Sequence, residues 1–317
     1  MAPMATDLVT GAFGYTGSRI AERLLEAGRD VVTLTRRERT AHPLEGRVRR
    51  LPYLFDDESL RAALGGIDTV YVTYWMRFPR GRSTWDEMVG NIARLSTSAR
   101  DAGLRRLVYI SVSNARADAA TAYFRAKAAA EERVRAAAAG PSLSVAIVRP
   151  TLLYGPGDIL INNMAWTLRR LPLFGIPGDG RYRVQPVLVD DVADLCVRVG
   201  ATDEAVEMDA AGPETLTFNE LVASVRRAVG SHALSAHMPA PAVLATTRLL
   251  GLIVRDVVLT RDEITELTNS YLVSESSRGT TPTRFSEWIH AHGGEIGRRW
   301  SSELERNFRS VQREAAS

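Results

Sequence analysis

Runs of β-branched and aromatic residues alternate with segments of helical periodicity through the first half of the chain. The apolar runs predict strands at residues 7–10, 30–35, 48–51, 69–73, 107–111 and 144–148. Between them, apolar positions recur at spacings of three and four, which predicts helices near residues 14–27, 57–64, 84–102 and 123–139. Strands that alternate with helices build a parallel sheet covered on both faces, so we expect a Rossmann-type, doubly wound α/β domain.

The pattern changes after Pro150, where prolines and glycines interrupt shorter helical segments, including an apolar one near residues 159–171. A seventh strand at 184–189 and a helix at 190–200 are expected to rejoin the first sheet. This predicts a Rossmann-type domain of residues 1–150 plus about 184–202. Residues 151–183 and 203–317, also approximate bounds, should form a smaller, mostly helical substrate lobe over the edge where such sheets bind ligands.

Composition and charge exclude several classes of protein. The chain has 317 residues, of which 45% are hydrophobic and 24% charged, as in folded soluble proteins. The net charge is only +3 and the arginines are interspersed with acids, so we expect no nucleic-acid partner. The apolar stretch 242–258 contains Arg248 and Arg255 and is too short to span a bilayer, so we expect no membrane partner.

The N-terminus lacks the pattern of a signal peptide, and the single cysteine, Cys196, allows neither an internal disulfide nor a cysteine-based zinc cluster. We therefore expect a cytoplasmic protein without a metal site.

A glycine-rich segment, residues 10–17, follows the first predicted strand and opens the first predicted helix. Its three glycines permit a tight turn, close approach of the backbone to a pyrophosphate, and close packing of helix on strand. The helix N-terminus then offers free N–H groups to phosphate. We predict that this loop binds a dinucleotide, with contacts from Thr10, Gly11, Phe13, Gly14, Tyr15, Thr16 and Gly17.

The end of the second predicted strand discriminates between the two nicotinamide cofactors. An acid there binds the ribose of NAD, whereas an arginine accommodates the 2′-phosphate of NADP. Here Thr35 is followed by Arg36 and Arg37, without an acid. The sequence favours NADP over NAD, with Arg36 and Thr35 as contacts. The alternative is that these arginines are solvated and either cofactor binds.

Lys127 is the only lysine in the chain and stands four residues after Tyr123; the other 39 of the 40 basic side chains are arginines. The compact lysine ammonium has three donors and cannot be replaced by the planar guanidinium of arginine. We therefore infer that this position requires a lysine. On a helix, a spacing of four places both side chains on one face, where the cation lowers the pKa of the phenol. Tyr-x-x-x-Lys also occurs by chance, but beside a nucleotide-binding loop it predicts a tyrosine proton donor.

Two serines end the fifth predicted strand. Ser111 and Ser113 are two residues apart and therefore face the same way. One of these hydroxyls can hold a substrate carbonyl while Tyr123 passes it a proton and Lys127 stabilises the tyrosinate and binds the nicotinamide ribose. Asn91 can anchor the lysine through a water. Alternatively, the serines satisfy backbone groups and Asn91 only caps or packs.

With these motifs in order, the chain resembles the short-chain dehydrogenase/reductase superfamily. Residues 149–157 (Arg-Pro-Thr-Leu-Leu-Tyr-Gly-Pro-Gly) and 189–194 (Val-Asp-Asp-Val-Ala-Asp) are similar to its extended branch of epimerases and dehydratases. The resemblance covers roughly residues 5–200 and implies NAD(P)-dependent chemistry with Tyr123 as acid or base. It also implies a cofactor contact at Pro150 and an Asp191 that is structural at least as often as functional.

Two departures from the extended branch narrow the reaction. Sugar-nucleotide enzymes of this branch carry a diphosphate-binding arginine where this chain has Val184, and the neighbouring Arg183 should face the other way. Sugar 4,6-dehydratases place an Asp-Glu pair where this chain has Asn114 and Ala115. Both differences argue against the activities of a sugar-nucleotide epimerase and of a sugar dehydratase.

Two aromatic residues, Trp75 and Phe78, follow the fourth predicted strand, where related enzymes carry small residues. They suggest a pocket for a flat or apolar substrate, although either can instead belong to the core. Ser111, Asn163 and Trp166 are further candidates for substrate binding.

We therefore expect an NADPH-dependent, ketoreductase-type oxidoreductase that reduces a carbonyl of a small or polycyclic substrate, as a monomer or homodimer. One alternative is a non-catalytic NADP-binding regulator or accessory subunit, since the chain is also similar to the atypical branch that holds the accessory nucleotide-binding subunit of respiratory complex I. Another is an NAD(P)-dependent epimerase or dehydratase. The retained Tyr123–Lys127 pair favours the reductase, although the short interval between Ser113 and Tyr123 makes the tyrosine's position less certain than the lysine's.

Overall fold

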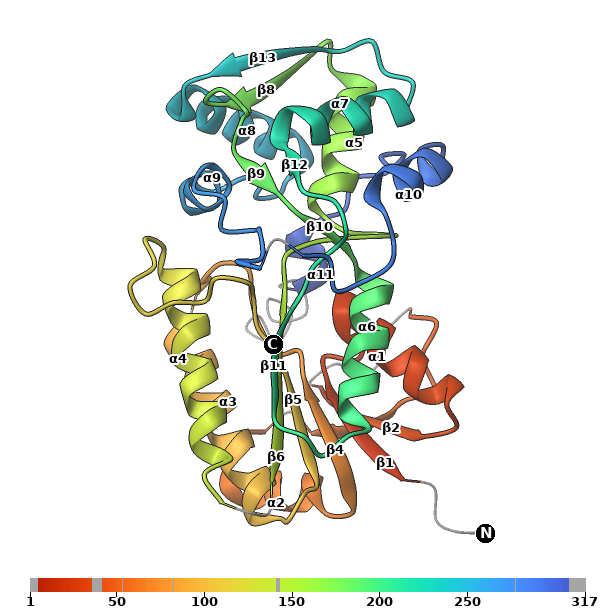
Figure 1. The fold of residues 1–317 in the computed structure, drawn as a ribbon, viewed down its shortest axis with the longest axis vertical. Coiled ribbons are helices and arrows are strands. Elements are labelled where there is room, and N and C mark those ends of the chain that lie inside the picture. The colour runs from red at the N-terminus through yellow and green to blue at the C-terminus, as the bar shows by residue number, and fades with distance from the viewer. Residues whose placement is uncertain are drawn as a thin grey trace, which may run out of the picture. The chain divides into compact units, whose positions relative to one another are not determined.

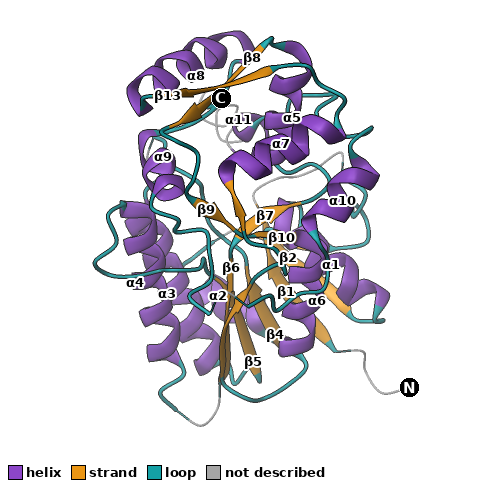
Figure 2. Cartoon of the chain, turned by 45° about the horizontal axis from the view of Figure 1, so that its top comes forward, coloured by secondary structure: helices purple, strands orange, loops and turns teal. Residues whose placement is uncertain are grey.

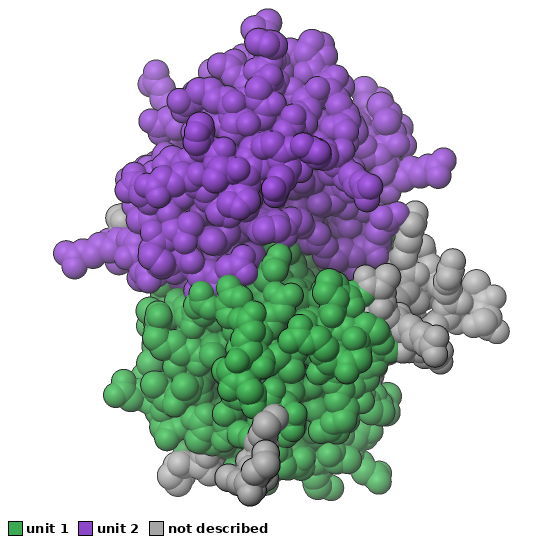
Figure 3. Space-filling model, turned by 90° about the vertical axis from the view of Figure 1, so that its right-hand side faces the viewer, with its two compact units in different colours: residues 1–150, 192–209 green, residues 151–191, 210–317 purple. Residues whose placement is uncertain are grey.

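The structure is a computed structural model that describes residues 5–35, 42–52, 54–81, 83–140, 143–276 and 278–307. The chain divides into two compact units, shown in Figure 3. Unit 1 comprises residues 1–150 and 192–209, and unit 2 comprises residues 151–191 and 210–317. The segment that returns to unit 1 is thus 192–209, where the sequence suggested about 184–202.

Unit 1 contains a seven-stranded sheet of order β11-β6-β5-β4-β1-β2-β3 (Figure 1). Its strands are β1 (Thr6–Thr10), β2 (Asp30–Thr35), β3 (Arg49–Pro52), β4 (Ile67–Val72), β5 (Arg106–Ile110), β6 (Ser144–Pro150) and β11 (Val206–Ala210). Strands β1 to β6 pair in parallel, and the strand order reverses between β1 and β4. This confirms the predicted doubly wound fold and all six predicted strands of the first half, with ends that differ by up to two residues.

Helices cover both faces of this sheet, with α3 and α4 on one side and α1 and α6 on the other in Figure 1. The helices of unit 1 are α1 (Tyr15–Glu26), α2 (Asp57–Leu64), α3 (Trp85–Asp101), α4 (Ala122–Ala137) and α6 (Val189–Gly200). Capping explains two of their starts, because the side chains of Asp56 and Thr84 accept hydrogen bonds from the first turns of α2 and α3. The central strands β4 and β5 are buried on both faces, and apolar or aromatic residues occupy the last three positions of β4 and the last four of β5.

The predicted seventh strand was wrong. Residues 183–188 instead form β9 (Arg183–Val184) and β10 (Pro186–Leu188), which pair with strands of unit 2. Pro186 has no N–H to donate, which suits a short strand in a two-stranded pair better than a place in a large sheet. The seventh strand is β11, whose sequence Val-Glu-Met-Asp-Ala lacks the apolar run of a buried strand because β11 lies at the edge. The predicted helix at 190–200 is confirmed as α6.

Helices predominate in the described part of unit 2, as expected and as the purple elements of Figure 2 show. They are α5 (Leu160–Arg170), α7 (Phe218–Ala228), α8 (Ala240–Val254), α9 (Arg261–Thr268), α10 (Phe285–His292) and α11 (Glu303–Asn307). Three two-stranded pairs join β10 to β7 (Leu152–Tyr154), β9 to β12 (Leu216–Thr217), and β8 (Leu173–Pro177) to β13 (Leu234–Met238). None of the described helices of the protein is both long and apolar enough to cross a bilayer.

Candidate functional site

The glycine loop of unit 1 joins β1 to α1 in a tightly folded turn. Gly11 has a φ of 71°, a left-handed conformation that favours glycine. The Gly14 N–H donates to the Gly11 carbonyl oxygen at 2.7 Å, which closes the turn. A Cβ atom at Gly17 would lie 2.2 Å from that same carbonyl oxygen, so α1 can approach the loop only with glycine there. Two of the three motif glycines are thus required by geometry.

The N-terminus of α1 is suited to an anion. Its N-cap residue, Gly14, has no side chain to bond the first-turn N–H groups, and the first turn carries no acid. The positive end of the helix dipole therefore remains available for a phosphate, in accord with the predicted contacts of Tyr15, Thr16 and Gly17. The residues present fit the diphosphate of a dinucleotide.

Thr10 ties the loop to the end of β4. Its hydroxyl oxygen accepts hydrogen bonds from the N–H groups of Thr73 and Tyr74 at 2.9 and 3.1 Å. On the other side, the Ala12 N–H donates to the Thr33 hydroxyl at 3.2 Å. These bonds hold the loop to both neighbouring strands, so Thr10 has a structural task beside its predicted contact with the cofactor.

Phe13 and the end of β2 border the loop. The Phe13 ring packs edge-on against His42, with centroids 5.7 Å apart, and the Arg50 guanidinium lies 5.2 Å from its centroid. Thr35 is the half-buried last residue of β2, and Arg36 lies outside the described residues. Its contact with a 2′-phosphate stays a prediction. Arg50 is a further cation of this region that sequence patterns did not single out, because β3 brings it here.

Tyr123 and Lys127 lie on one face of α4, as their spacing predicted. Tyr123 stands in the first turn, directly after the first helical residue, Ala122. Its half-buried ring lies edge-on to the indoles of Trp75 and Trp85, at centroid distances of 6.1 and 6.0 Å. Trp85 opens α3 and was missed by sequence reasoning, because only the packing of α3 on α4 brings it to the tyrosine.

Lys127 is buried, with 3% of its surface exposed. Its ammonium donates to the Ile110 carbonyl oxygen at 3.0 Å and lies 4.3 Å from the ring centroid of Trp75 and 5.2 Å from that of Tyr109. Burial lowers the pKa of Lys127 to about 7, against the opposing charge of Glu131. The carbonyl and the two aromatic faces replace part of the lost hydration. The predicted contact with the cofactor ribose stays a prediction.

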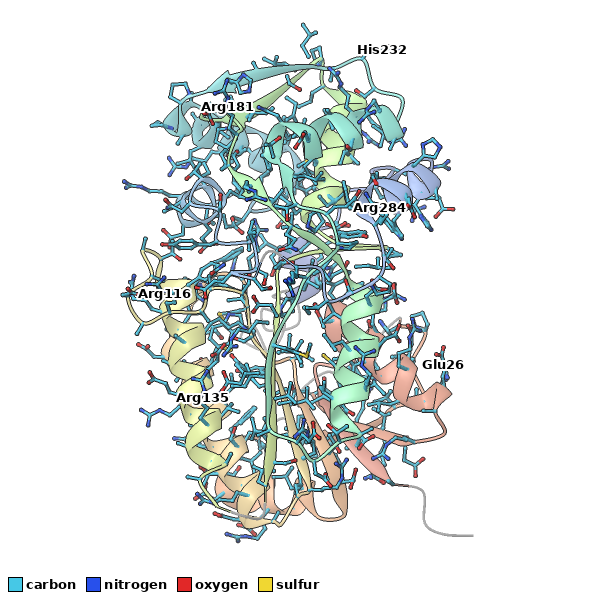
Figure 4. All side chains as sticks on the ribbon, in the orientation of Figure 1. Glu26, Arg116, Arg135, Arg181, His232 and Arg284 are labelled. Carbon is cyan, nitrogen blue, oxygen red and sulfur yellow. The ribbon has the colours of Figure 1, made fainter. Side chains whose placement is uncertain are left out.

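A network of ion pairs around the buried Glu131 holds α4 against the edge of the sheet. Glu131, one turn beyond Lys127, is 2% exposed and bonds both nitrogens of a fork from Arg149 on β6, at 2.8 and 2.7 Å. Arg149 and Arg135 also bond Glu207 of β11, at 2.5 and 2.6 Å. Arg135 is labelled on α4 in Figure 4. Because these residues are far apart in the chain, nothing in the sequence indicated that they would meet.

The strand-end serines continue the pairing of β5 with β6. The Ser111 N–H donates to the Val148 carbonyl at 2.8 Å, and the Ser113 N–H donates to the Pro150 carbonyl at 3.0 Å. Both side chains are buried. Asn91, also buried, donates to the Tyr74 hydroxyl at 3.3 Å. The structure thus places these residues in unit 1 with Tyr123, and their catalytic roles stay predictions.

Phe78 lies beside the guanidinium of Arg77, 5.7 Å from ring centroid to cation. Trp75, by contrast, packs on the main core of unit 1 as well as on Tyr123 and Lys127. Trp75 therefore contacts the core, and its contact with a substrate stays a prediction.

The two substrate candidates of unit 2 take part in contacts within that unit. The Asn163 side chain donates to the Ser301 carbonyl and accepts from the Ser301 N–H, both at 2.9 Å. Trp166 packs edge-on against Trp300, with centroids 5.2 Å apart. Both residues therefore hold the segment before α11 against α5. Their contact with a substrate stays a prediction.

Asp191, Val184 and Arg183 agree with expectations from the sequence, whereas the left-handed backbone of Asn114 was not predicted. Asp191 accepts hydrogen bonds from the N–H and hydroxyl of Thr283 at 3.0 and 2.9 Å, which is a structural task. Val184 is fully buried in the core of unit 2 and Arg183 is exposed, so the two side chains face opposite ways. Asn114 has a φ of 59°. An apolar core residue thus occupies the place of the diphosphate-binding arginine.

Comparison with known proteins gives a consistent family. The sequence profile of the NAD dependent epimerase/dehydratase family matches residues 8–210. NADH dehydrogenase (ubiquinone) 1 alpha subcomplex subunit 9, mitochondrial, of Arabidopsis thaliana is 25% identical over 292 residues, which cover 85% of this chain and 71% of that protein. A dTDP-4-dehydro-6-deoxy-D-allose reductase of a Streptomyces species is 29% identical over 287 residues, covering 78% and 88%.

A solved structure, MoeE5 in complex with UDP-glucose and NAD, has a TM-score of 0.65 and 22% identity. The similarity covers 97% of this chain and 100% of that one, and it shows a shared fold.

Replacing Gly17 with alanine should weaken dinucleotide binding, because the added Cβ would overlap the Gly11 carbonyl. A strain of about 1–3 kcal/mol corresponds to a loss of about 5- to 150-fold in affinity for NADPH, measured by fluorescence titration. Gly90→Ala is the matched control: Gly90 lies within α3 and a Cβ there meets nothing within 4 Å. The control should bind normally and gain about 0.5–1 kcal/mol in stability. Equal affinities of the two variants would contradict this account of the loop.

The buried ammonium of Lys127 should make stability depend on pH. Its pKa is about 7 in the folded protein and 10.5 ordinarily, so the unfolded chain binds more protons between these values. The free energy of unfolding should therefore rise from pH 7 toward pH 10.5 relative to that of Lys127→Met, which has no such titration. Urea unfolding of both proteins across this pH window measures the difference between their free energies of unfolding. Groups that both proteins share, such as Cys196, titrate in both and cancel from this difference. Parallel curves would show that the lysine does not titrate there.

Proposed function

Because the chain belongs to the NAD dependent epimerase/dehydratase family, we propose that it is an NADPH-dependent reductase that transfers hydride to a carbonyl. The observation that carries this proposal is the Tyr123–Lys127 pair on α4, in the same unit as an α1 N-terminus that fits a diphosphate. The similarity to a Streptomyces reductase supports reduction as the reaction.

A bound nicotinamide would supply the hydride. Tyr123 then donates its phenolic proton to the carbonyl oxygen as negative charge develops there. The Lys127 ammonium, one helical turn away, stabilises the resulting tyrosinate. The hydroxyl of Ser111 or Ser113 orients the carbonyl, and Asn91 supports the lysine through water.

The residues around Tyr123 favour a flat or apolar carbonyl compound. Trp75 and Trp85 place two indoles edge-on to the phenol, and Phe78 lies on the same segment as Trp75. A nucleotide sugar fits less well, because Val184 is a core residue where related enzymes carry an arginine. Asn114 likewise offers no carboxylate for the elimination that a dehydratase performs. These positions weaken the alternative of an epimerase or dehydratase.

A specific contact supports a second candidate function, an NADP-binding regulator or accessory subunit. The Lys127 ammonium is bonded to Ile110 and covered by Trp75, so it already has partners without a cofactor. The similarity to a subunit of mitochondrial NADH dehydrogenase points the same way. A protein of this kind would bind the dinucleotide without turnover.

Loss of the Tyr123 hydroxyl should abolish most carbonyl reduction. In a screen of ketones and aldehydes for NADPH oxidation, Tyr123→Phe should lower kcat/KM about 100-fold or more, with NADPH affinity changed little. The control is Tyr182→Phe, which removes a buried hydroxyl without a hydrogen-bond partner among the described residues. Undiminished activity of Tyr123→Phe would remove the tyrosine from the mechanism. Tight NADPH binding without turnover of any carbonyl would favour the regulator.

The cofactor preference rests on Arg36, after Thr35 and with no acid at the end of β2. Arg36→Ala should weaken NADPH binding at least about 10-fold by removing a charge-assisted bond to the 2′-phosphate, and should leave NADH binding unchanged. Arg116→Ala removes the same charge from an exposed ion pair elsewhere in unit 1 and serves as control. Calorimetric titration with each cofactor measures the affinities. Equal NADPH and NADH affinities in all three proteins would contradict a preference for NADP.

A further inference from the structure

Helix α8 of unit 2 exposes three large apolar side chains. Figures 1 and 2 show it beside β8 and β13. Val243 is its one buried residue, whereas Leu249 is 64% exposed and Leu252 and Ile253 are each 77% exposed. Large apolar side chains that are exposed together on one element are typical of a surface that binds another protein or a membrane.

These side chains form one stripe along the helix. Leu249, Leu252 and Ile253 are three and four residues apart, so at 100° per residue they share a face. Arg248, next to Leu249 in the helix, and Arg255, the C-cap residue after Val254, are both exposed. Residues 240–254 contain no acid, so the exposed face combines apolar and basic groups without a compensating carboxylate.

Both ends of α8 are held by unit 2. Near its start, Val243 lies close to Gly175 of β8. Beyond its end, the buried carboxylate of Asp256 accepts hydrogen bonds from the Trp300 indole and the Glu303 N–H, both at 2.9 Å. Asp256 is the first acid after the helix, and its carboxylate is buried and hydrogen-bonded within unit 2. The stripe is therefore presented by a fixed helix rather than by a loop.

We propose that α8 binds the surface of a bilayer that contains anionic lipids. Leu249, Leu252 and Ile253 would enter the boundary between headgroups and acyl chains, while Arg248 and Arg255 contact lipid phosphates. The helix has 15 residues and contains Arg248, so it can lie on a bilayer but does not span one. The expectation of no membrane partner rested on the length and the charges of this stretch, which exclude a spanning helix but not one that lies on the surface.

Charge favours a lipid surface over a second copy of this chain. In a symmetric dimer through α8 the same patch meets itself, which brings the arginines of two chains together without an acid to neutralise them. Anionic headgroups neutralise both arginines at once. The proposal does not depend on the reductase activity, because binding is measured without turnover.

The test is cosedimentation of the full chain with vesicles of phosphatidylcholine alone and of equimolar phosphatidylcholine and phosphatidylglycerol. The chain should bind the mixed vesicles, and high salt should weaken binding. The double variant Leu252→Ser, Ile253→Ser should lower the affinity at least about 10-fold, and Arg248→Gln should lower it several-fold.

The matched control is Leu54→Ser in unit 1, which replaces a leucine that is 50% exposed and should leave binding unchanged. Circular dichroism and thermal unfolding of each variant check that it folds.

Three results would overturn the proposal: no binding to mixed vesicles, equal binding to both vesicle types, or unchanged binding by the double variant. A concentration-dependent dimer that dissociates in the double variant, without vesicle binding, would also overturn it by assigning the stripe to a second copy.

Discussion

Unit 1 must keep one ammonium group, that of Lys127, in its interior. A buried ammonium is costly unless its N–H groups find acceptors and its charge finds a favourable field. The Ile110 carbonyl supplies an acceptor, and the rings of Trp75 and Tyr109 supply negative faces. These partners belong to the end of β5 and to the segment after β4, so the lysine fixes where α4 begins relative to both strands. The position of Tyr123, one turn earlier, follows from this constraint.

The ion-pair network beyond Lys127 extends the same constraint to the edge of the sheet. Glu131 would be a second buried charge, opposite in sign, and its fork from Arg149 neutralises it. Arg149 in turn shares Glu207 with Arg135, so α4, β6 and β11 are connected by one set of charges. Removing Arg149 would leave the buried carboxylate of Glu131 without its bidentate partner. An uncompensated buried charge strongly destabilises a folded protein.

Each unit contains a helix with one feature that the stability of the fold does not require. In unit 1, the uncapped and acid-free start of α1 contributes nothing to its own stability but suits a phosphate. In unit 2, the apolar stripe of α8 contributes little to the core, since only Val243 is buried. Such features suit binding, because a free helix N-terminus attracts anions and an uncovered apolar face is typical of an interaction surface.

Local patterns in the sequence determined the parallel strands, the helices between them, the glycine loop and the shared face of Tyr123 and Lys127. Each depends on neighbours within a few residues, where backbone geometry and periodicity act. The family resemblance, which rested on those motifs, is confirmed by the match over residues 8–210. The role of Val206–Ala210 as seventh strand, the meeting of Glu207 with Arg149, and the position of Trp85 beside Tyr123 were decided by tertiary structure. These depend on contacts between residues far apart in the chain, which no local pattern encodes. The exposure of α8 belongs with them, because an apolar sequence looks the same whether its helix is covered or left open to solvent.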